Sequence, residues 1–556
     1  MSSERVIYLP LGGAGEIGMN AYVYGYGKPG QERLILVDLG VAFPDMDSTP
    51  GVDLIFPDMN WLIERRDRLE AIFVTHAHED HLGAIAHFHT QLGAPIHARP
   101  FTANLARRKM AEHGHPEKAV VTVNPWPETV QLGPFNVGFV PISHSIPEAS
   151  GMVIDTPGGR IVHTGDFKID HEPGVGEPFD EALWREIGAP GVLALACDST
   201  NVFSTHPGRS ESALRGDIEA LVAGSRGMFV ATTFASNVAR LKTLADAGER
   251  AGRSICLLGR AMRRMIEAAV ETGVLKDFPR TISPEDAKSI PREDLMLIVT
   301  GSQGERRAAS AQLSQGKYQG LTLKSGDTFL FSSKTIPGNE RAVARIMNNL
   351  SEMGVDVVDE SGGRYHVSGH ANAPDLSVMH DLTKPAMVVP MHGEHRHLRA
   401  HVKLCDENGY RGVLAPNGTM IDLSAEPPAV AEYVETGRSY LDGSVRIGAL
   451  DGVVRDRIRL ALNGHVMINV IFDEDDEPIG DPWCEISGLP DRGPSDAPLV
   501  DVLEEDLGQY MARAGSKTLA DDDTLEEGLR KAVRQSAQAE IGKRPEVTVI
   551  ISRLSA

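Results

Sequence analysis

Short apolar runs separated by turn-forming residues dominate the first 200 residues and predict β-strands. The clearest runs are VIYLPL at 6–11, MNAYVYGYG at 19–27, RLILVDLG at 33–40, VGFVPIS at 137–143 and RIVHTGD at 160–166. Helical periodicity is occasional in this region, as in the stretch after Asp80. Many strands with few helices are typical of two sheets packed face to face and covered by helices, an αββα sandwich.

The pattern changes after about residue 206, where strand-like runs alternate with amphipathic stretches. The strands are expected at 228–234, 254–259, 295–301 and 328–333, and the helices at 236–252, 261–273 and 339–354. This alternation predicts a parallel sheet flanked by helices, inserted into the sandwich.

The end of the chain predicts a small α+β domain. A β-rich stretch runs to about residue 472, and the acidic run DEDDEP at 473–478 predicts a solvated linker. Two helices are expected at 499–515 and 524–542, and a strand at 547–554. The predicted segments are the sandwich at 1–205 and 356–440, the α/β insertion at 206–355, the β-rich extension and linker at 441–477, and the C-terminal domain at 478–556.

The string THAHEDHLG at 75–83 carries the strongest chemical signal. It places His76, His78, Asp80 and His81 within six residues, directly after the apolar run AIFVT. Imidazole and carboxylate ligands at this spacing suit a pair of Zn²⁺ or Mn²⁺ ions. A His-rich surface loop is the alternative reading of the string alone.

Further candidate ligands follow other strand-like runs. His144 comes after VGFVPI, Asp166 after RIVHT, and His392 after PAMVVPM. Each of these histidines taken singly is more typical of a partly buried side chain than of a ligand. Their common placement at strand ends favours convergence at one edge of the sandwich.

These motifs, with Asp38 in ILVDLG, resemble the metallo-β-lactamase superfamily. The resemblance implies that one metal is held by His76, His78 and His144 and the other by Asp80, His81 and His392. It further implies that Asp166 bridges the two metals and that Asp38 orients ligands through hydrogen bonds, as such partners do. The alternative for Asp38 is an ordinary turn residue before Gly40.

About 220 residues separate Asp166 from His392, far more than a plain lactamase fold needs. The strings ALACDSTNV, ATTFASNVAR, VTGSQGE and HVSGHANAPD in this interval resemble the β-CASP insertion of nucleic-acid-processing members, and the set is most similar to the bacterial ribonuclease J family. Arg306 and Arg307 follow GSQGE where that family usually has proline. If they face the RNA groove, they add contacts to phosphates, and if they face solvent, they are neutral surface.

The resemblance implies a ribonuclease with 5′→3′ exonuclease activity on single-stranded RNA carrying a 5′-monophosphate, together with endonuclease activity, in rRNA processing and mRNA turnover. Two divalent ions, Zn²⁺ before Mn²⁺ or Mg²⁺, would activate water for in-line attack. Asp80 would help to orient the nucleophile, His370 would donate a proton or contact phosphate, and Asp198 would hold His370. The implied substrate contacts are His366, Val367, Ser368, Gly369, His370, Ser236 and Asn237.

Charge is distributed unevenly along the 556 residues. The net charge is −22, yet residues 213–350 carry 20 Lys and Arg against 14 Asp and Glu, while residues 441–556 carry 13 against 23. A basic insertion on an acidic chain can neutralise phosphates locally and limit non-specific binding. A hydrophobic content of 41% is that of an ordinary globular protein.

The four cysteines lack CxxC spacing, and together with the absence of a signal-like start or a long apolar run they predict a reduced, cytoplasmic protein without membrane contact. The family resemblance implies a homodimer or homotetramer that can join an RNA-degrading complex, with the C-terminal segment as the natural interface.

Several features of the chain admit another interpretation. Gly13, Gly15 and Gly18 match GxGxxG, but an aromatic, strand-like run follows where a dinucleotide site needs a helix, so a loop between strands is expected. Asp53 is either a ligand of a Ca²⁺-like ion or, more typically, a turn residue. A thioester or lactone hydrolase, a DNA nuclease and a non-catalytic RNA-binding subunit are the competing functions.

Overall fold

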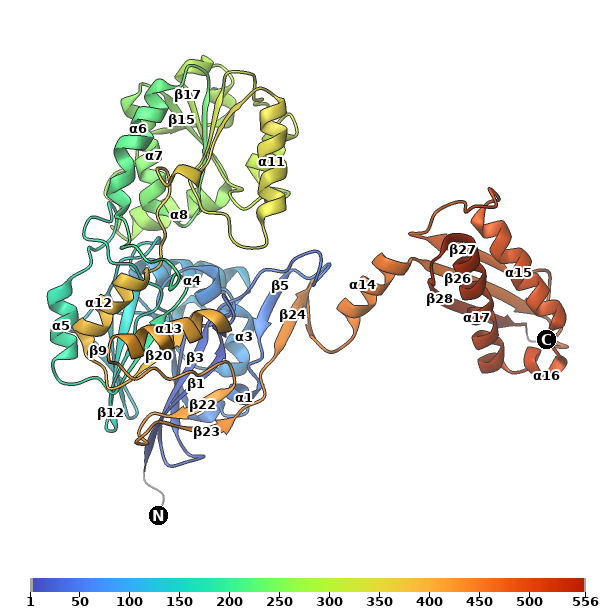
Figure 1. Cartoon of the computed structure of the whole chain (residues 1–556), viewed down its shortest axis with the longest axis horizontal. Coiled ribbons are helices and arrows are strands. Elements are labelled where there is room, and N and C mark those ends of the chain that lie inside the picture. Colours follow the sequence, from blue (N-terminus) through green and yellow to red (C-terminus); the bar gives the residue numbers. More distant parts are fainter. Residues whose placement is uncertain (1–3, 555–556) are drawn as a thin grey trace. The chain divides into compact units, whose positions relative to one another are not determined.

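The computed structural model describes residues 4–554, the side chain of residue 361 excepted. It separates into two compact units, one of residues 1–42 and 56–438 and the other of residues 43–55 and 439–556. Figure 1 follows the chain through both. No helix within the described part of the chain is both long and apolar enough to cross a membrane.

Two sheets form the base of the first unit. The first, in the order β23-β22-β1-β3-β4-β6-β7-β8, contains β1 (Arg5–Gly12), β3 (Ala21–Gly27), β4 (Arg33–Val37), β6 (Leu69–Phe73), β7 (Ile96–Ala98), β8 (Val120–Thr122), β22 (Thr419–Asp422) and β23 (Ala429–Tyr433). The second, in the order β20-β13-β12-β11-β10-β9, contains β9 (Thr129–Leu132), β10 (Phe135–Pro141), β11 (Ser150–Thr156), β12 (Gly159–His163), β13 (Ala194–Asp198) and β20 (Val388–Met391).

The two sheets share one hydrophobic core, and helices cover their outer faces. Tyr24 and Phe73 of the first sheet pack in one cluster with Phe139 and Ile154 of the second. Near the first sheet lie α1 (Asn60–Ile63), α2 (Glu79–Leu82), α3 (Ile85–Leu92) and α4 (Pro100–Glu112). The outer face of the second sheet buries α5 (Glu181–Gly188), α12 (Ala373–Thr383) and α13 (His395–Glu407). This arrangement confirms the predicted αββα sandwich.

The insertion forms a parallel sheet in the order β16-β15-β17-β14-β18-β19, as predicted. Its strands are β14 (Phe229–Thr232), β15 (Ser254–Leu258), β16 (Thr281–Ile282), β17 (Leu295–Val299), β18 (Thr328–Phe331) and β19 (Asp356–Val358). Its helices are α6 (Arg215–Gly224), α7 (Val238–Arg250), α8 (Arg260–Glu271), α9 (Pro284–Ala287), α10 (Ala309–Ser314) and α11 (Glu340–Glu352). Figure 1 shows α6 and α7 on one side of this sheet and α11 on the other.

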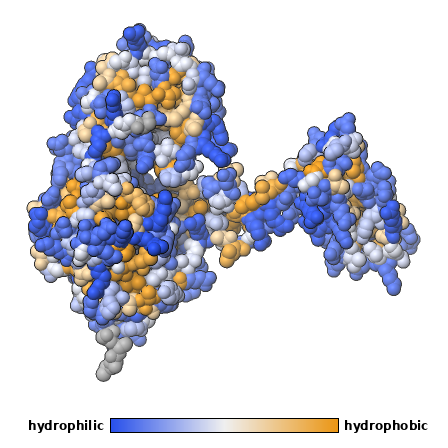
Figure 2. Space-filling view, viewed as in Figure 1, coloured by the Kyte–Doolittle hydropathy of each residue, from blue (hydrophilic) through white to orange (hydrophobic). Residues whose placement is uncertain are grey.

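The second unit centres on a three-stranded sheet in the order β27-β26-β28. Its elements are β24 (Arg438–Asp442), β25 (Val445–Gly448), α14 (Val453–Asn463), β26 (His465–Phe472), β27 (Trp483–Ser487), α15 (Leu499–Arg513), α16 (Ser516–Leu519), α17 (Asp522–Ile541) and β28 (Glu546–Arg553). Leucines of α15 and α17 pack on β26, and the outer surface is mainly hydrophilic in Figure 2.

The acidic run DEDDEP lies in the loop between β26 and β27. These two strands pair in antiparallel fashion, so the run connects neighbouring strands of one sheet. The sheet therefore contains residues from both sides of the expected boundary at 477/478.

The glycine-rich segment after β1 leads into a strand. Gly13, Gly15 and Gly18 all have positive φ angles, which glycine adopts without steric cost. The short strand β2 (Ala14–Gly15) pairs with β21 (Gly393–Glu394), directly after His392, and β3 follows. The three glycines therefore belong to a loop beside His392, one of the expected metal ligands. The element after this loop is a strand, whereas a dinucleotide site would need a helix there.

Candidate metal centre

The HxHxDH string begins where β6 ends and continues into α2. The backbone N–H and hydroxyl of Thr75 both donate to the carboxylate of Asp38. The same carboxylate lies 2.8 Å from His81 Nδ1. Gly40 packs against the backbone of Asp80 so closely that a Cβ atom there would lie 1.6 Å from the Asp80 carbonyl oxygen. Asp38 thus holds the ring of His81 with Nε2 directed inward, the orienting contact expected from the sequence.

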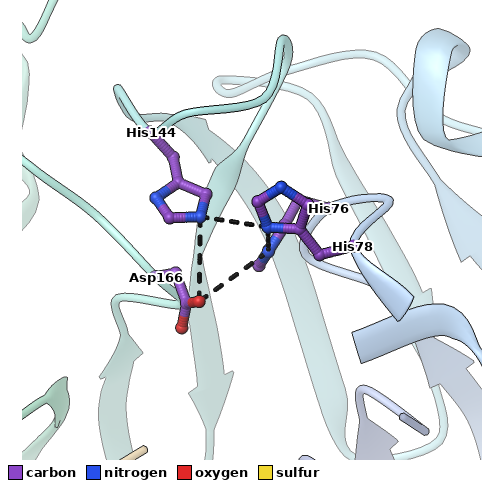
Figure 3. Close-up of side chains that lie close together, drawn as sticks. All are labelled: His76, His78, His144 and Asp166. Carbon is purple, nitrogen blue, oxygen red and sulfur yellow. Dashed lines mark hydrogen bonds and ion pairs between the residues drawn. The ribbon is translucent and has the colours of Figure 1, made fainter. Parts of the chain in front are cut away.

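Three histidines and Asp166 form the first ligand set (Figure 3). Nδ1 of His78 lies 3.0 Å from His76 Nε2 and 3.2 Å from His144 Nε2. Asp166 Oδ2 lies 3.9 Å from His76 Nε2 and 3.8 Å from His144 Nε2. One ligand atom from each residue lies within 4.8 Å of all the others.

A second set of ligands shares Asp166 with the first. It contains Asp80, His81, Asp166 and His392. His81 Nε2 lies 3.2 Å from Asp166 Oδ2 and 3.6 Å from Asp80 Oδ2, while His392 Nδ1 lies 2.6 Å from Asp166 Oδ1. All seven ligands expected from the sequence are therefore brought together, with Asp166 between the two sets.

The donor chemistry of the first set suits a metal ion. Burial lowers the pKa of His78 to about 4 and holds the pKa of His76 and of His144 well below the ordinary range. Neutral imidazole is the form that binds metals. Three neutral rings whose nitrogens converge cannot all donate to one another, so the residues present fit a cation at their centre.

His370 and Asp198 form a pair beside the second set. His370 Nδ1 lies 2.8 Å from Asp198 Oδ2 and 4.0 Å from Asp166 Oδ2. Asp198 Oδ1 accepts hydrogen bonds from the N–H and hydroxyl of Thr200. Burial alone lowers the pKa of His370, but the Asp198 and Asp166 carboxylates outweigh it and raise the pKa above its ordinary value.

The HVSGH segment contacts the metal ligands through its backbone. His144 Nδ1 donates to the carbonyl oxygen of Gly369 at 2.6 Å, which directs His144 Nε2 toward the other ligands. Ser368 Oγ accepts from Asn201 Nδ2 at 2.7 Å and from the N–H of His370 at 3.1 Å. No role for Asn201 was predicted, although it lies within the string ALACDSTNV.

The other residues expected to contact substrate are buried or partly buried. Val367 is buried, and burial lowers the pKa of His366 to about 3. Asn237 is buried, and its Oδ1 caps α7 by accepting from Arg240 N. Ser236 Oγ lies 3.0 Å from His78 Nε2, so the insertion contacts a metal ligand directly.

Asp53 lies in the second unit. Its carboxylate accepts a hydrogen bond from Gly443 N at 2.8 Å, and its N–H donates to the carbonyl of Leu441. Among the described residues, the groups of side chains close enough to share a metal ion do not include Asp53. These contacts are those of a turn residue, the alternative expected for Asp53.

A cavity of about 1010 Å³ adjoins the ligands, lined by residues of the sandwich and of the insertion. Ala77 and Glu79, on either side of His78, form part of its wall. Of the two arginines that stand where the family usually has proline, Arg307 lines the cavity. The basic lining residues are Arg108, Lys109, Arg260, Arg263, Arg264 and Arg307.

Gly369→Ala is expected to weaken metal binding by about 10–100-fold, because residues that orient ligands usually have effects of this size. A Cβ atom at Gly369 would lie 2.7 Å from Ser145 Oγ and 2.9 Å from His144 Cε1 and would displace the ring. Competition with a chelator measures the affinity. Gly362→Ala is the matched control, because its Cβ would lie in ordinary contact distance, 4.0 Å, from Arg364 Cγ. Unchanged affinity in Gly369→Ala would contradict the role of the Gly369 carbonyl.

Comparisons with known proteins agree with this architecture. Four family models match: "Beta-lactamase superfamily domain" at residues 42–194, "Ribonuclease J, beta-CASP domain" at 226–350, "Zn-dependent metallo-hydrolase RNA specificity domain" at 363–416 and "Ribonuclease J C-terminal domain" at 452–554.

Curated relatives match over nearly the whole chain. Ribonuclease J of Sinorhizobium meliloti is 40% identical over 99% of this chain and 98% of that protein. Ribonuclease J of Mycolicibacterium smegmatis is 37% identical over 96% and 94%, respectively. A crystal structure of a protein of unknown function from Enterococcus faecalis matches with a TM-score of 0.51 at 17% identity, covering 75% of this chain and 99% of that one, a likeness of fold alone.

Proposed function

From the premise that the chain belongs to the ribonuclease J family, we propose that it removes nucleotides from the 5′ end of single-stranded RNA and favours a 5′-monophosphate. The chain is a metal-dependent ribonuclease, a phosphodiester hydrolase of RNA processing. We further propose endonuclease activity on the same substrates and roles in rRNA maturation and mRNA turnover. The observation that carries the proposal is the His370–Asp198 pair beside the two ligand sets.

Two divalent ions are proposed as cofactors, with Zn²⁺ favoured by the imidazole-rich ligands and Mn²⁺ or Mg²⁺ as alternatives. One ion would be held by His76, His78 and His144, and the other by Asp80, His81 and His392. Asp166 would contribute a ligand to both. When bound, the ions would supply Lewis-acid activation of the phosphodiester and of water.

His370 is the proposed proton donor to the leaving 3′-oxygen. Asp198 holds Nδ1 of the ring and thereby leaves Nε2 as the nitrogen that faces substrate. The Asp198 and Asp166 carboxylates raise the pKa of this imidazole, which favours the protonated form that a general acid requires. Asp198 acts through His370 and is a positioning residue.

The RNA is proposed to enter through the cavity beside the ligands. Its arginines and Lys109 would contact phosphates, and Glu79, Glu112, Glu285 and Glu305 on the same wall would limit the net charge. Hydroxyl and backbone donors near Ser368 would recognise the 5′-monophosphate.

The purified protein with Mn²⁺ or Zn²⁺ should release mononucleotides from 3′-labelled RNA with a 5′-monophosphate, faster than from the 5′-triphosphate or 5′-hydroxyl forms. His76→Ala should release none, because the first ligand set loses a nitrogen. Matched DNA oligonucleotides and a small thioester test the competing functions. Cleavage of DNA or thioester with intact RNA would overturn the proposed substrate.

We propose that the protein is cytoplasmic and self-associates as a homodimer or homotetramer through its C-terminal domain, with an RNA-degrading complex as a further partner. Deletion of residues after Gly448 should lower the number of chains per particle, obtained from the light-scattering mass divided by the mass of one chain. The metal content per chain should stay unchanged, because the expected ligands precede this point. The cut precedes β26, since β26 loses both pairing strands if the chain stops at 478. An unchanged number of chains per particle would exclude this interface.

A further inference from the structure

We propose that a second buried site, formed by Cys197, His380 and His401, binds a zinc-class metal ion apart from the candidate metal centre. The three residues, termed the Cys-His-His cluster, come from β13, α12 and α13. One ligand atom from each lies within 4.8 Å of the others, and none of the three side chains has measurable exposure. Such a set differs from the neighbouring centre because it includes a thiol.

The two rings of the cluster face each other through the same type of nitrogen. His380 Nε2 lies 3.1 Å from His401 Nε2, a separation at which both atoms can coordinate one ion. His401 Nδ1 lies 2.9 Å from Ser199 Oγ, the contact that a metal-binding imidazole usually makes through its other nitrogen. Burial lowers the pKa of His380 to about 4 and that of His401 well below its ordinary range, so both rings are neutral.

The donor types select the ion. Two imidazoles and one thiolate are ligands that Zn²⁺ accepts in structural sites, whereas Mg²⁺ and Ca²⁺ prefer oxygen. The closed, apolar surroundings match a structural site with no position for substrate.

An ion at this site would tie together three elements that lead to the candidate metal centre. β13 ends at Asp198, α12 begins shortly after His370, and α13 begins shortly after His392. The ion would therefore stabilise the positions of the proton donor and of one metal ligand without taking part in the reaction. The metal site of the cluster can therefore be tested independently of the proposed function, because metal binding can be measured without RNA.

Substitution with Co²⁺ tests the proposal in the full-length protein. The candidate metal centre offers only nitrogen and oxygen ligands, so a thiolate-to-cobalt charge-transfer band in the near ultraviolet would report on the Cys-His-His cluster alone. The wild-type protein should show this band. Cys197→Ser should remove it, and Cys256→Ser, which alters a buried thiol of β15 in the insertion, should retain it.

A wild-type protein that binds cobalt without a thiolate band would overturn the proposal, as would a band that survives Cys197→Ser. Because the variant can fail to fold, X-ray absorption of the zinc-loaded wild type provides a second measurement. Sulfur in the first coordination shell of zinc is expected, and a shell of nitrogen and oxygen alone would also overturn the proposal.

Discussion

His370→Ala is expected to lower the rate of RNA cleavage by about 10²–10⁴-fold, the usual contribution of a positioned proton donor. The metal content should stay unchanged, because the seven expected ligands remain in place. Single-turnover cleavage of 5′-monophosphorylated RNA and metal analysis of the same preparation measure both quantities. Loss of activity with retained metal would identify a role in proton transfer or phosphate contact.

Two variants control this experiment. His113→Ala removes an exposed histidine at the end of α4 and should leave the rate unchanged. Asp198→Asn keeps the shape of the His370 partner but removes its charge, so the pKa of His370 should fall and the alkaline limb of the pH–rate profile should move to lower pH. Full activity in His370→Ala would remove this residue from the proposed mechanism.

Arg240→Met is expected to lower the free energy of unfolding by about 3–5 kcal/mol, because breaking a buried ion pair leaves one charge uncompensated. Arg240 is fully buried in α7 and binds both carboxylate oxygens of Glu211, one at 3.0 Å. It also donates to the carbonyls of Ser332 and Tyr365. These contacts join the chain entering the insertion, its sheet and the chain leaving it.

Denaturant unfolding followed by circular dichroism measures this loss. Arg250→Met on the same helix is the matched control: its ion pair with Glu219 is exposed and should contribute about 0–1 kcal/mol. The double variant Arg240→Met with Glu211→Leu should recover part of the stability, because it removes both charges. A single variant as stable as the control would show that this ion pair does not hold the insertion.

Much of the fold and of the ligand arrangement could be predicted from local patterns. His76, His78, Asp80 and His81 are close in sequence, and their spacing needs no tertiary information. His144, Asp166 and His392 follow apolar runs, and the ends of neighbouring strands meet at one edge of the second sheet. The near-continuous apolar runs of residues 5–200 likewise reflect burial of both faces of the central strands.

Apart from the contact of Asp38 with His81, the contacts that orient these ligands were not predicted. Ser236 is 158 residues from His78, and Gly369 is 225 residues from His144. Ser236 is a serine near the start of a helix, and Gly369 acts through its backbone carbonyl. Neither feature identifies a distant contact partner from the sequence alone. The same applies to the Arg240–Glu211 pair, because a charged residue in an amphipathic helix is more typical of an exposed face.

The organisation of the C-terminal region shows a second limit. The acidic run DEDDEP has the composition of a linker, yet it turns the chain between β26 and β27. The partner of β26 on its other side is β28, the last strand. Composition reports solvent exposure, and exposure alone does not distinguish a tight connection from a boundary between domains.

The pairing of β1 with β22 and the late position of His392 set the order in which a nascent chain can mature. A chain leaving the ribosome from its N-terminus completes the parallel sheet of the insertion first, since all six strands of that sheet lie between residues 229 and 358. The sandwich stays open until β20 and β22 emerge. The full set of expected metal ligands is therefore present only after residue 392 has been synthesised, so a nascent ribonuclease of this architecture cannot complete its metal centre before that point.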